Sequence, residues 1–345
     1  MITIGRHGNR VYLDASGSLA TVYCRTQELV ASTPTLVPYD PPHNTMLSEA
    51  INVAASNCCF AFGSTPKQGV ARLLPNHFLN LDTFEAVRHW PHSAEKKVHD
   101  PPAAIQAITA LVRGAVEAVC VNHRPYLSLT AGRDSRMLLA MCRRLRGIRY
   151  FTWSFPDGRV DIQMAKRLAR QFALDHHVLR YVAPSGTDVR EWLFRTGESV
   201  GELRGMRLST TLKAMDPAAP YVPALASEVG RAFYWREGDE NRIALTATDI
   251  IERMELPEVP ELEEAAERWL AGVPFRHPYD VLDLLYIEQR LDCWASVVAY
   301  AADGVFRITP FSNRTVFETM MGLPFEYRKG QKLADDIIRS AWPSC

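Results

Sequence analysis

The sequence has no excess of either charge. Its 39 lysine and arginine residues are balanced by 39 aspartate and glutamate residues, so the formal net charge is zero at pH 7. A chain without a basic excess has no overall attraction to nucleic acid or to an anionic membrane surface. Any anion-binding site must therefore be local.

The cysteine patterns that mark disulfide frameworks and zinc sites are also missing. The chain has seven cysteines but no C-x-x-C spacing, and the adjacent pair Cys58 and Cys59 is poorly suited to chelating a metal. Reduced thiols are the simplest interpretation. The other cysteines are Cys24, Cys120, Cys142, Cys293 and Cys345.

Neither a signal peptide nor a membrane span is expected. Residues 1–6 lack the apolar run of a signal peptide. We find no apolar stretch that approaches the roughly 20 residues a membrane span needs. The sequence therefore predicts a soluble cytoplasmic protein.

The first 92 residues have the texture of a β-rich module. Short apolar stretches alternate with Gly, Pro, Asn and Asp, at residues 10–13, 20–23, 36–37, 60–62 and 77–81. The polar, proline-ended segment 91–102 is the expected linker. At 345 residues the chain is long enough for two domains, so we expect one over residues 1–92 and another over 101–345.

Beyond the linker the pattern changes to helices alternating with strands. We expect helices over residues 104–120, 135–145 and 160–172, and strands over 126–129, 148–154 and 177–182. This alternation is typical of parallel βαβ units, so the predicted fold class is α/β, a parallel sheet with flanking helices. Residues beyond 188 are expected to be helical, apart from a strand at 221–225.

One segment, residues 127–136, has the order of a nucleotide-binding loop: an apolar strand, a turn of small residues and a polar helix start. In an open parallel sheet, ligands bind beyond the carboxyl ends of the strands, where helix amino termini favour anions. The hydroxyl groups of Thr130 and Ser135 add donors, and Arg133 and Arg136 add positive charge. The alternative is an ordinary turn in which Asp134 or Ser135 caps the helix.

The loop Thr130-Ala131-Gly132-Arg133-Asp134-Ser135 resembles the S-G-G-x-D-S signature of the ATP-pyrophosphatase superfamily. No Gly-Lys-Ser/Thr follows it, so it is not a Walker loop. The resemblance implies an adenine nucleotide alpha-hydrolase-like fold. It also implies that Leu129 and the six loop residues bind the nucleotide and hold its pyrophosphate during adenylation.

Further segments are similar to the asparagine synthetase family. Trp153-Ser154-Phe155 corresponds to a segment that contacts adenosine in that family, and Asp161 lies near a family acidic residue. Residues 226–234 resemble the second pyrophosphate motif, whose Asp-Glu pair binds magnesium. The resemblance implies a Mg²⁺ ion held by Asp134 and Glu228.

Two positions depart from the family pattern. Ser227 stands where the family has the aspartate, and Asp335 falls nearest to the family's lysine, which Lys329 or Lys332 could replace only in another register. Arg231 offers a planar guanidinium group suited to phosphate or carboxylate. The expected catalytic residues are Asp134, Glu228 and Arg231.

The amino-terminal module is similar to the later half of the glutamine amidotransferase domain that precedes these synthetases, on residues 11–23, 30–33 and 70–78. That domain uses a cysteine at its processed amino terminus, whereas this chain has Ile2. We therefore expect no glutaminase activity, and free ammonia or an amine as the nitrogen donor. The alternative is a module that only stabilises the second domain.

The resemblance implies an ATP-dependent, AMP-forming amide ligase that adenylates a carboxylate and uses ATP and Mg²⁺. The alternative is a nucleotide-binding protein that does not ligate and acts through a protein partner; a homodimer is compatible with either. An RNA-modifying enzyme of the same superfamily is disfavoured by the neutral charge and the lack of a cysteine pair. A metal site at His176 and His177 is disfavoured because no acidic or cysteine partner lies at ligand spacing.

Overall fold

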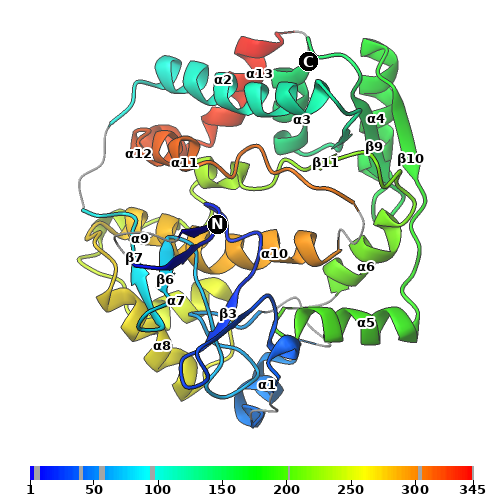
Figure 1. Cartoon of the computed structure of the whole chain (residues 1–345). Helices are drawn as coiled ribbons and strands as arrows, with labels where there is room; N and C mark the ends of the chain where they lie inside the picture. The colour runs from blue at the N-terminus through cyan, green and yellow to red at the C-terminus, as the bar shows by residue number, and fades with distance from the viewer. Residues whose placement is uncertain are drawn as a thin grey trace. The chain divides into compact units, whose positions relative to one another are not determined.

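A computed structural model describes residues 1–3, 8–38, 42–53, 59–93, 98–200, 203–301 and 305–343 (Figure 1). Cys58, Cys345 and residues 94–97 of the expected linker lie outside these ranges. The chain divides into two compact units, each formed from three separate stretches. Unit 1 comprises Met1–Glu95, Pro184–Met206 and Tyr234–Tyr300, and unit 2 comprises Lys96–Ala183, Arg207–Phe233 and Ala301–Cys345.

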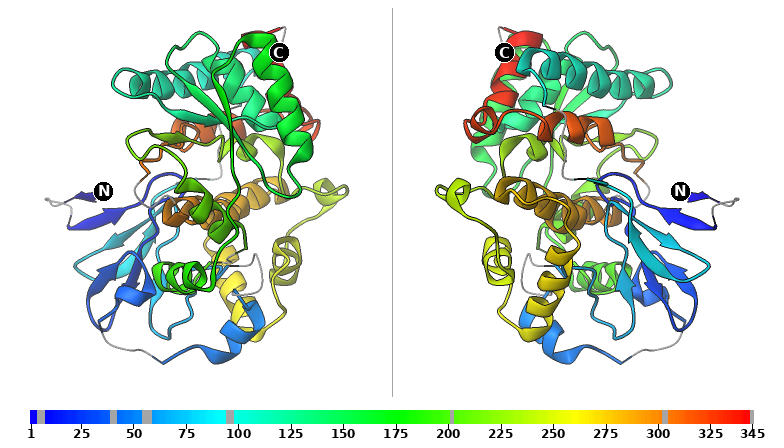
Figure 2. Two further views of the ribbon diagram at one scale, coloured as in Figure 1. Left: turned by 90° about the vertical axis from the view of Figure 1, so that its right-hand side faces the viewer. Right: turned by 90° about the vertical axis from the view of Figure 1, so that its left-hand side faces the viewer.

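Unit 1 begins with two small antiparallel sheets, which appear in blue and cyan in Figure 2. The first sheet has the order β1-β2-β6-β7 and the second has the order β4-β3-β5. Their bounds are Ile2–Thr3 (β1), Arg10–Tyr12 (β2), Val22–Cys24 (β3), Leu29–Ala31 (β4), Ala71–Arg72 (β5), His77–Asn80 (β6) and Glu85–Arg88 (β7). The β-rich texture read from the sequence is confirmed.

Two of the short apolar stretches that contributed to the β-rich texture are not strands. Residues 36–37 lie at the end of the 3-10 helix Pro34–Leu36, where proline at the first position favours a helical turn. Residues 60–62 form no strand; Cys59, just before them, makes a single bridge to Val200. A helix that we did not expect, α1 (Thr45–Ile51), begins after Asn44, whose side chain caps it.

The rest of unit 1 is helical. Its helices are α5 (Gly186–Thr196), η3 (Asp239–Asn241), α7 (Ala247–Met254), α8 (Pro260–Ala271), α9 (Pro278–Leu285) and α10 (Asp292–Ala301). A π-helical turn, Tyr286–Leu291, joins α9 to α10 without a break. The sequence predicted helix here, but not that these helices would pack in the same unit as residues 1–95.

Unit 2 contains a four-stranded parallel sheet, which confirms the α/β class. The strands are β8 (Tyr126–Ser128), β9 (Arg149–Trp153), β10 (His176–Leu179) and β11 (Tyr221–Val222). They lie in the order β10-β9-β8-β11, and all three pairings are parallel. From β8 the chain therefore builds the sheet outward to β10 on one side, and later adds β11 on the other side.

Helices flank this sheet. They are α2 (Pro101–Cys120), α3 (Arg133–Cys142), α4 (Arg159–Phe172), α11 (Arg314–Met321), α12 (Phe325–Lys329) and α13 (Lys332–Ala341), with the short 3-10 helix η2 (Ser227–Arg231). Helix α4 packs on β9 and β10, while α3 packs on β8, α2 and α13. Helix α6 (Leu203–Leu212) lies where the chain passes from unit 1 to unit 2.

Helix α2 corrects one expectation. It is 20 residues long and includes an 18-residue window with a mean hydropathy of 1.5, so it is long and apolar enough by composition to cross a membrane. Its buried residues recur every three or four positions and form a single stripe, at Ala104, Ile108, Val112, Val116 and Val119. Core helices of globular domains meet the same length and hydropathy criteria, so this single helix is weak evidence for a membrane span.

Candidate functional site

The order of the parallel sheet defines where a ligand is expected. The order in which the chain adds strands reverses at β8: β9 and β10 lie on one side of it, and β11, the edge strand, lies on the other side. Ligands of such sheets bind outside the carboxyl ends of the strands at this switch point. Because β8 and β11 are parallel, the loops that follow them leave from the same edge of the sheet. These loops carry most of the residues that the sequence indicated.

The loop after β8 is held in a tight turn by its own side chains. The Ser135 hydroxyl accepts from the backbone N–H of Thr130 at 3.0 Å and lies 2.9 Å from the Thr130 hydroxyl. The Thr130 hydroxyl in turn accepts from the N–H of Gly132 at 3.1 Å. At the strand end, Thr152 of β9 donates to the carbonyl of Leu129 at 2.6 Å. Ser135 therefore closes the loop and does not cap the helix.

The amino terminus of α3 is left without a side-chain cap. Its N-cap residue is Gly132, which has no side chain that could cap the first turn. The first N–H groups of a helix have no intrahelical acceptor, and together with the helix dipole they favour an anion. The amides of Arg133 and Asp134 are the donors that a phosphate group would meet here.

Asp161 holds the middle of the loop. Asp161 lies in the first turn of α4, and one of its carboxylate oxygens accepts from the N–H of Ala131 at 2.8 Å. A carboxylate oxygen in this position occupies a donor that a phosphate oxygen would otherwise use. A phosphate group bound at this loop would therefore have to displace Asp161 or use the amides of α3.

An arginine joins the two loops. The Arg231 guanidinium lies 3.3 Å from a carboxylate oxygen of Asp134 and 3.8 Å from one of Glu228. The side chain of Arg231 is 30% exposed, that of Asp134 is 23% exposed and that of Glu228 is 13% exposed, so solvent reaches the group. All three expected catalytic residues therefore lie together at the switch point.

Buried polar atoms accompany this group. Among the described residues, the second carboxylate oxygen of Asp134 and the hydroxyl of Ser227 are both buried without a hydrogen-bond partner. Ser227 itself is 2% exposed. Buried polar groups are normally satisfied, so these two atoms are suited to bonding with a polar ligand at this edge of the sheet.

The short helix η2, which carries Glu228 and Arg231, is tightly positioned. It is entered through Ala226 in a left-handed conformation, with φ 75°, which is uncommon for a residue with a Cβ. The fully buried Arg328 donates to the carbonyl of Val229 at 3.0 Å. The left-handed residue at its start and the buried arginine thus hold the backbone of η2 in position.

The segment expected to contact adenosine ends β9. The Ser154 hydroxyl accepts from the N–H of Tyr181 at 2.9 Å, so it ties two neighbouring strand ends together. The Trp153 ring lies edge-on to that of Phe151, with their centroids 4.7 Å apart. The centroid of the Phe155 ring lies 6.2 Å from that of Trp153 and 5.4 Å from that of Tyr181. Trp153, Ser154 and Phe155 are partly buried. The rings of Trp153 and Phe155 form an aromatic wall at the carboxyl edge of the sheet.

The carboxyl-terminal helix presents an acid to the loop. Asp335 of α13 lies 3.7 Å from the Arg133 guanidinium, and Gln331 accepts from the same arginine at 3.5 Å. The position nearest to the family's lysine is thus occupied by an acid that pairs with a loop arginine. Sequence reasoning did not identify Gln331 or Arg328, because no motif surrounds them and their roles depend on contacts distant in sequence.

Asp134 and Glu228 are carboxylates at the switch point that could contribute to holding a magnesium ion. Over the described ranges, no group of three or more His, Cys, Asp or Glu side chains could hold a metal ion. Magnesium is commonly held by one or two carboxylates together with substrate phosphate oxygens and water. Asp134 and Glu228, with one unpartnered oxygen on Asp134, fit an ion that arrives with a nucleotide, and not a preformed all-protein site.

His176 and His177 have other contacts. The ring of His176 lies 2.8 Å from the Thr152 hydroxyl, and His177 lies 2.9 Å from the Asp175 carboxylate on the surface. Burial lowers the pKa of His176 below its ordinary value, and the positive charges of His177 and Lys166 lower it further. A neutral ring that bonds to a strand residue is a structural contact.

Comparison with known proteins adds no family. The sequence matches none of the protein-family models searched, and no curated protein matches it significantly. The resemblance carried by the motifs therefore stays a prediction, beside the geometry of the switch point.

Proposed function

We propose that this protein is an ATP-dependent amide ligase that forms AMP. A carboxylate oxygen of the substrate attacks the α-phosphorus of ATP, and the bond to the β-phosphate bridging oxygen breaks, releasing pyrophosphate. Ammonia or an amine then attacks the carbonyl carbon of the acyl-adenylate. AMP leaves, the nitrogen loses a proton, and an amide bond is formed.

The observation that supports this proposal is the meeting of Asp134, Glu228 and Arg231 at the switch point of the sheet. Charge that develops on departing pyrophosphate is stabilised by fixed donors and cations. Arg231 and the amino terminus of α3 supply such groups at the edge where nucleotides bind in parallel sheets. Positioning and neutralisation of charge are enough for this step.

Magnesium would be held by Asp134 and Glu228 together with the phosphates of ATP, where it would neutralise charge on the phosphate oxygens. The chain's own residues divide the remaining work. Arg231, which lies beside both carboxylates, would offer its guanidinium group to the phosphate oxygens. The aromatic wall of Trp153 and Phe155 is the surface suited to a purine ring.

The test is pyrophosphate release with ATP and Mg²⁺ against a panel of carboxylic acids and amines that includes aspartate. The wild type should release pyrophosphate only with particular acids. Asp134→Asn should lower that rate by roughly 100-fold, because the site loses a carboxylate charge that would hold the magnesium ion.

Asp216→Asn is the matched control. Asp216 pairs with Arg149 at 3.3 Å on the surface, and Arg149 begins β9, so this pair lies at the opposite edge of the sheet from the loop. Its removal should leave the rate unchanged. Equal loss in both variants, or release that no acid stimulates, would contradict an adenylating ligase.

A second candidate has its own support. Ser227 supplies no carboxylate where the family has one, and Arg231 holds Asp134 and Glu228 together. These features favour a nucleotide-binding protein that does not ligate and acts through a partner protein. It is supported if calorimetry detects ATP binding that Asp134→Asn abolishes, while no acid elicits pyrophosphate.

A further inference from the structure

Unit 1 contains a cavity of about 480 Å³, and none of its described lining residues is among those assigned to the nucleotide. One part of its lining is aromatic and comprises Tyr23, Phe62 and Trp269. The ring centroids of Phe62 and Trp269 are 6.2 Å apart, and the planes of the two rings are inclined at 49°. The other part is basic, with Arg72, Arg88 and Arg268. No described lining residue is an acid.

Arg88 is fixed at the cavity by a buried carboxylate. Glu288 is 0% exposed and accepts two bonds from the Arg88 guanidinium, one of them at 2.9 Å. It also accepts from the Asn76 amide at 2.8 Å and from the Trp269 indole at 2.7 Å. One acid behind the cavity therefore orients both an arginine and the largest aromatic ring of the lining.

Arg72 is fixed in the same manner. Its guanidinium lies 2.9 Å from the Asp292 carboxylate and donates to the Ser296 hydroxyl at 3.0 Å. Arg72 and Asp292 are 4% and 2% exposed. Burial raises the pKa of Asp292, and the charge of Arg72 opposes this rise.

Both acids come from the same distorted part of the helical rod. Glu288 lies in the π-helical turn Tyr286–Leu291, and Asp292 follows it directly. Single π-helical turns are rare in proteins, but those that occur lie frequently at functional sites. Burying two carboxylates is costly for stability, whereas orienting side chains in this way is what a preorganised binding site requires.

The three arginines of the lining differ in their exposure to solvent. The carboxylate partners of Arg72 and Arg88 engage their terminal nitrogen atoms, and these two side chains are 3% and 15% exposed. Arg268 at the rim is 71% exposed, and its Glu264 partner is 3.7 Å away. His77 adds a ring whose pKa is lowered by burial. Arg268 and the exposed part of Arg88 are therefore the donors that a ligand with acceptor oxygens can reach.

We propose that this cavity is a binding site for a small organic carboxylate with a flat aromatic ring. The ring packs against Trp269 and Phe62, and the carboxylate accepts from the arginine side of the cavity. The site requires neither ATP nor the loop after β8. It therefore stands or fails independently of the proposed ligase activity.

The probe is 4-fluorobenzoate, observed by ¹⁹F NMR with the full-length protein. Saturable binding is expected, with 4-fluorobenzamide at least about tenfold weaker because it lacks the charge. Arg268→Gln should weaken benzoate binding by a similar factor. Arg276→Gln, an exposed arginine of the same unit outside the lining, should leave it unchanged.

A second pair of variants tests the cavity itself. Ala86 of β7 is exposed and lines the cavity, so Ala86→Trp should fill it and abolish binding. The neighbouring Val87 points to the other face of the strand, and Val87→Trp should bind as the wild type does. Equal binding of benzoate and benzamide, no binding at millimolar probe, or binding that survives Ala86→Trp would overturn the proposal.

Discussion

Gly230 illustrates how closely single residues are constrained beside the candidate site. A Cβ at this position would lie 2.5 Å from a methyl group of Leu333 on α13. Gly230→Ala should therefore destabilise the fold by about 1–3 kcal/mol through overpacking. Gly114→Ala is the control, because nothing lies within 4 Å of its Cβ position on the exposed side of α2, and it should stabilise by about 0.5–1 kcal/mol. Urea unfolding measures both, and equal effects would argue against the close approach of η2 to α13.

His77 predicts a pH effect at the same scale. Burial lowers its pKa in the folded protein, so as the pH falls below about 6.5 the unfolded chain takes up a proton before the folded protein does. Stability contributed by the neutral ring is therefore lost on acidification. His77→Gln should show a smaller loss of unfolding free energy between about pH 7.5 and 5.5 than the wild type. The exposed His123→Gln should follow the wild type, and identical slopes for all three proteins would refute this reading.

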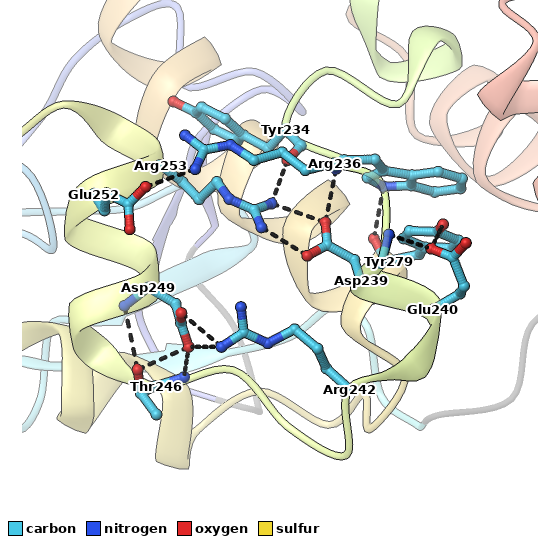
Figure 3. Close-up of polar contacts among 12 residues, drawn as sticks. Tyr234, Arg236, Asp239, Glu240, Arg242, Thr246, Asp249, Glu252, Arg253 and Tyr279 are labelled. Atoms are coloured by element: carbon cyan, nitrogen blue, oxygen red, sulfur yellow. Dashed lines mark hydrogen bonds and ion pairs between the residues drawn. The ribbon is translucent and has the colours of Figure 1, made fainter.

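At the scale of elements, the segment from Tyr234 to α7 is held by an ion pair that Figure 3 shows in detail. Arg253 of α7 donates to both oxygens of Asp239 in η3, at 2.9 and 2.6 Å, and to the carbonyl of Tyr234 at 2.6 Å. Asp239 and Arg253 are 2% and 8% exposed. The bridge therefore joins η3 to α7 in a place where water cannot replace it.

This geometry predicts that Asp239→Ala destabilises the protein by about 3–5 kcal/mol, because Arg253 keeps a buried charge without its partner. The double variant Asp239→Ala with Arg253→Met should lose less unfolding free energy than Asp239→Ala alone, because it leaves no unpaired buried charge. Glu252→Ala, beside Arg253 but 65% exposed and paired with the exposed Arg236, should cost less than about 1 kcal/mol. Thermal unfolding of the four proteins tests the order, and a harmless Asp239→Ala would contradict it.

At the scale of the whole molecule, each unit is assembled from stretches distant in sequence. Residues 1–95 share unit 1 with 184–206 and 234–300. Phe62 N–H donates to Gln289 at 2.7 Å, and the pairs Arg72–Asp292 and Arg88–Glu288 join the same stretches. The helical part of unit 1 thus depends on arginines from the amino-terminal module.

A fragment of residues 101–345 therefore should not keep residues 234–300 folded. It leaves Glu288 and Asp292 without Arg88 and Arg72, and the unpaired buried carboxylates favour opening of the helices. Hydrogen exchange should show protection in the parallel sheet but little in α9 and α10, compared with the full-length protein. Full protection in those helices would instead support an independent domain over 101–345.

Local patterns in the sequence determined much of this protein. Alternating apolar residues predicted β2 and β6, the helical period predicted α2 and α4, and the small-residue turn at Thr130 to Ser135 predicted the loop before α3, because these features depend on neighbours in the chain. Residues 36–37 and 60–62 were too short for periodicity to decide. Only the tertiary structure placed β11 beside β8, brought Arg231 to Asp134 and set Glu288 behind Arg88, since these contacts join residues far apart in the chain.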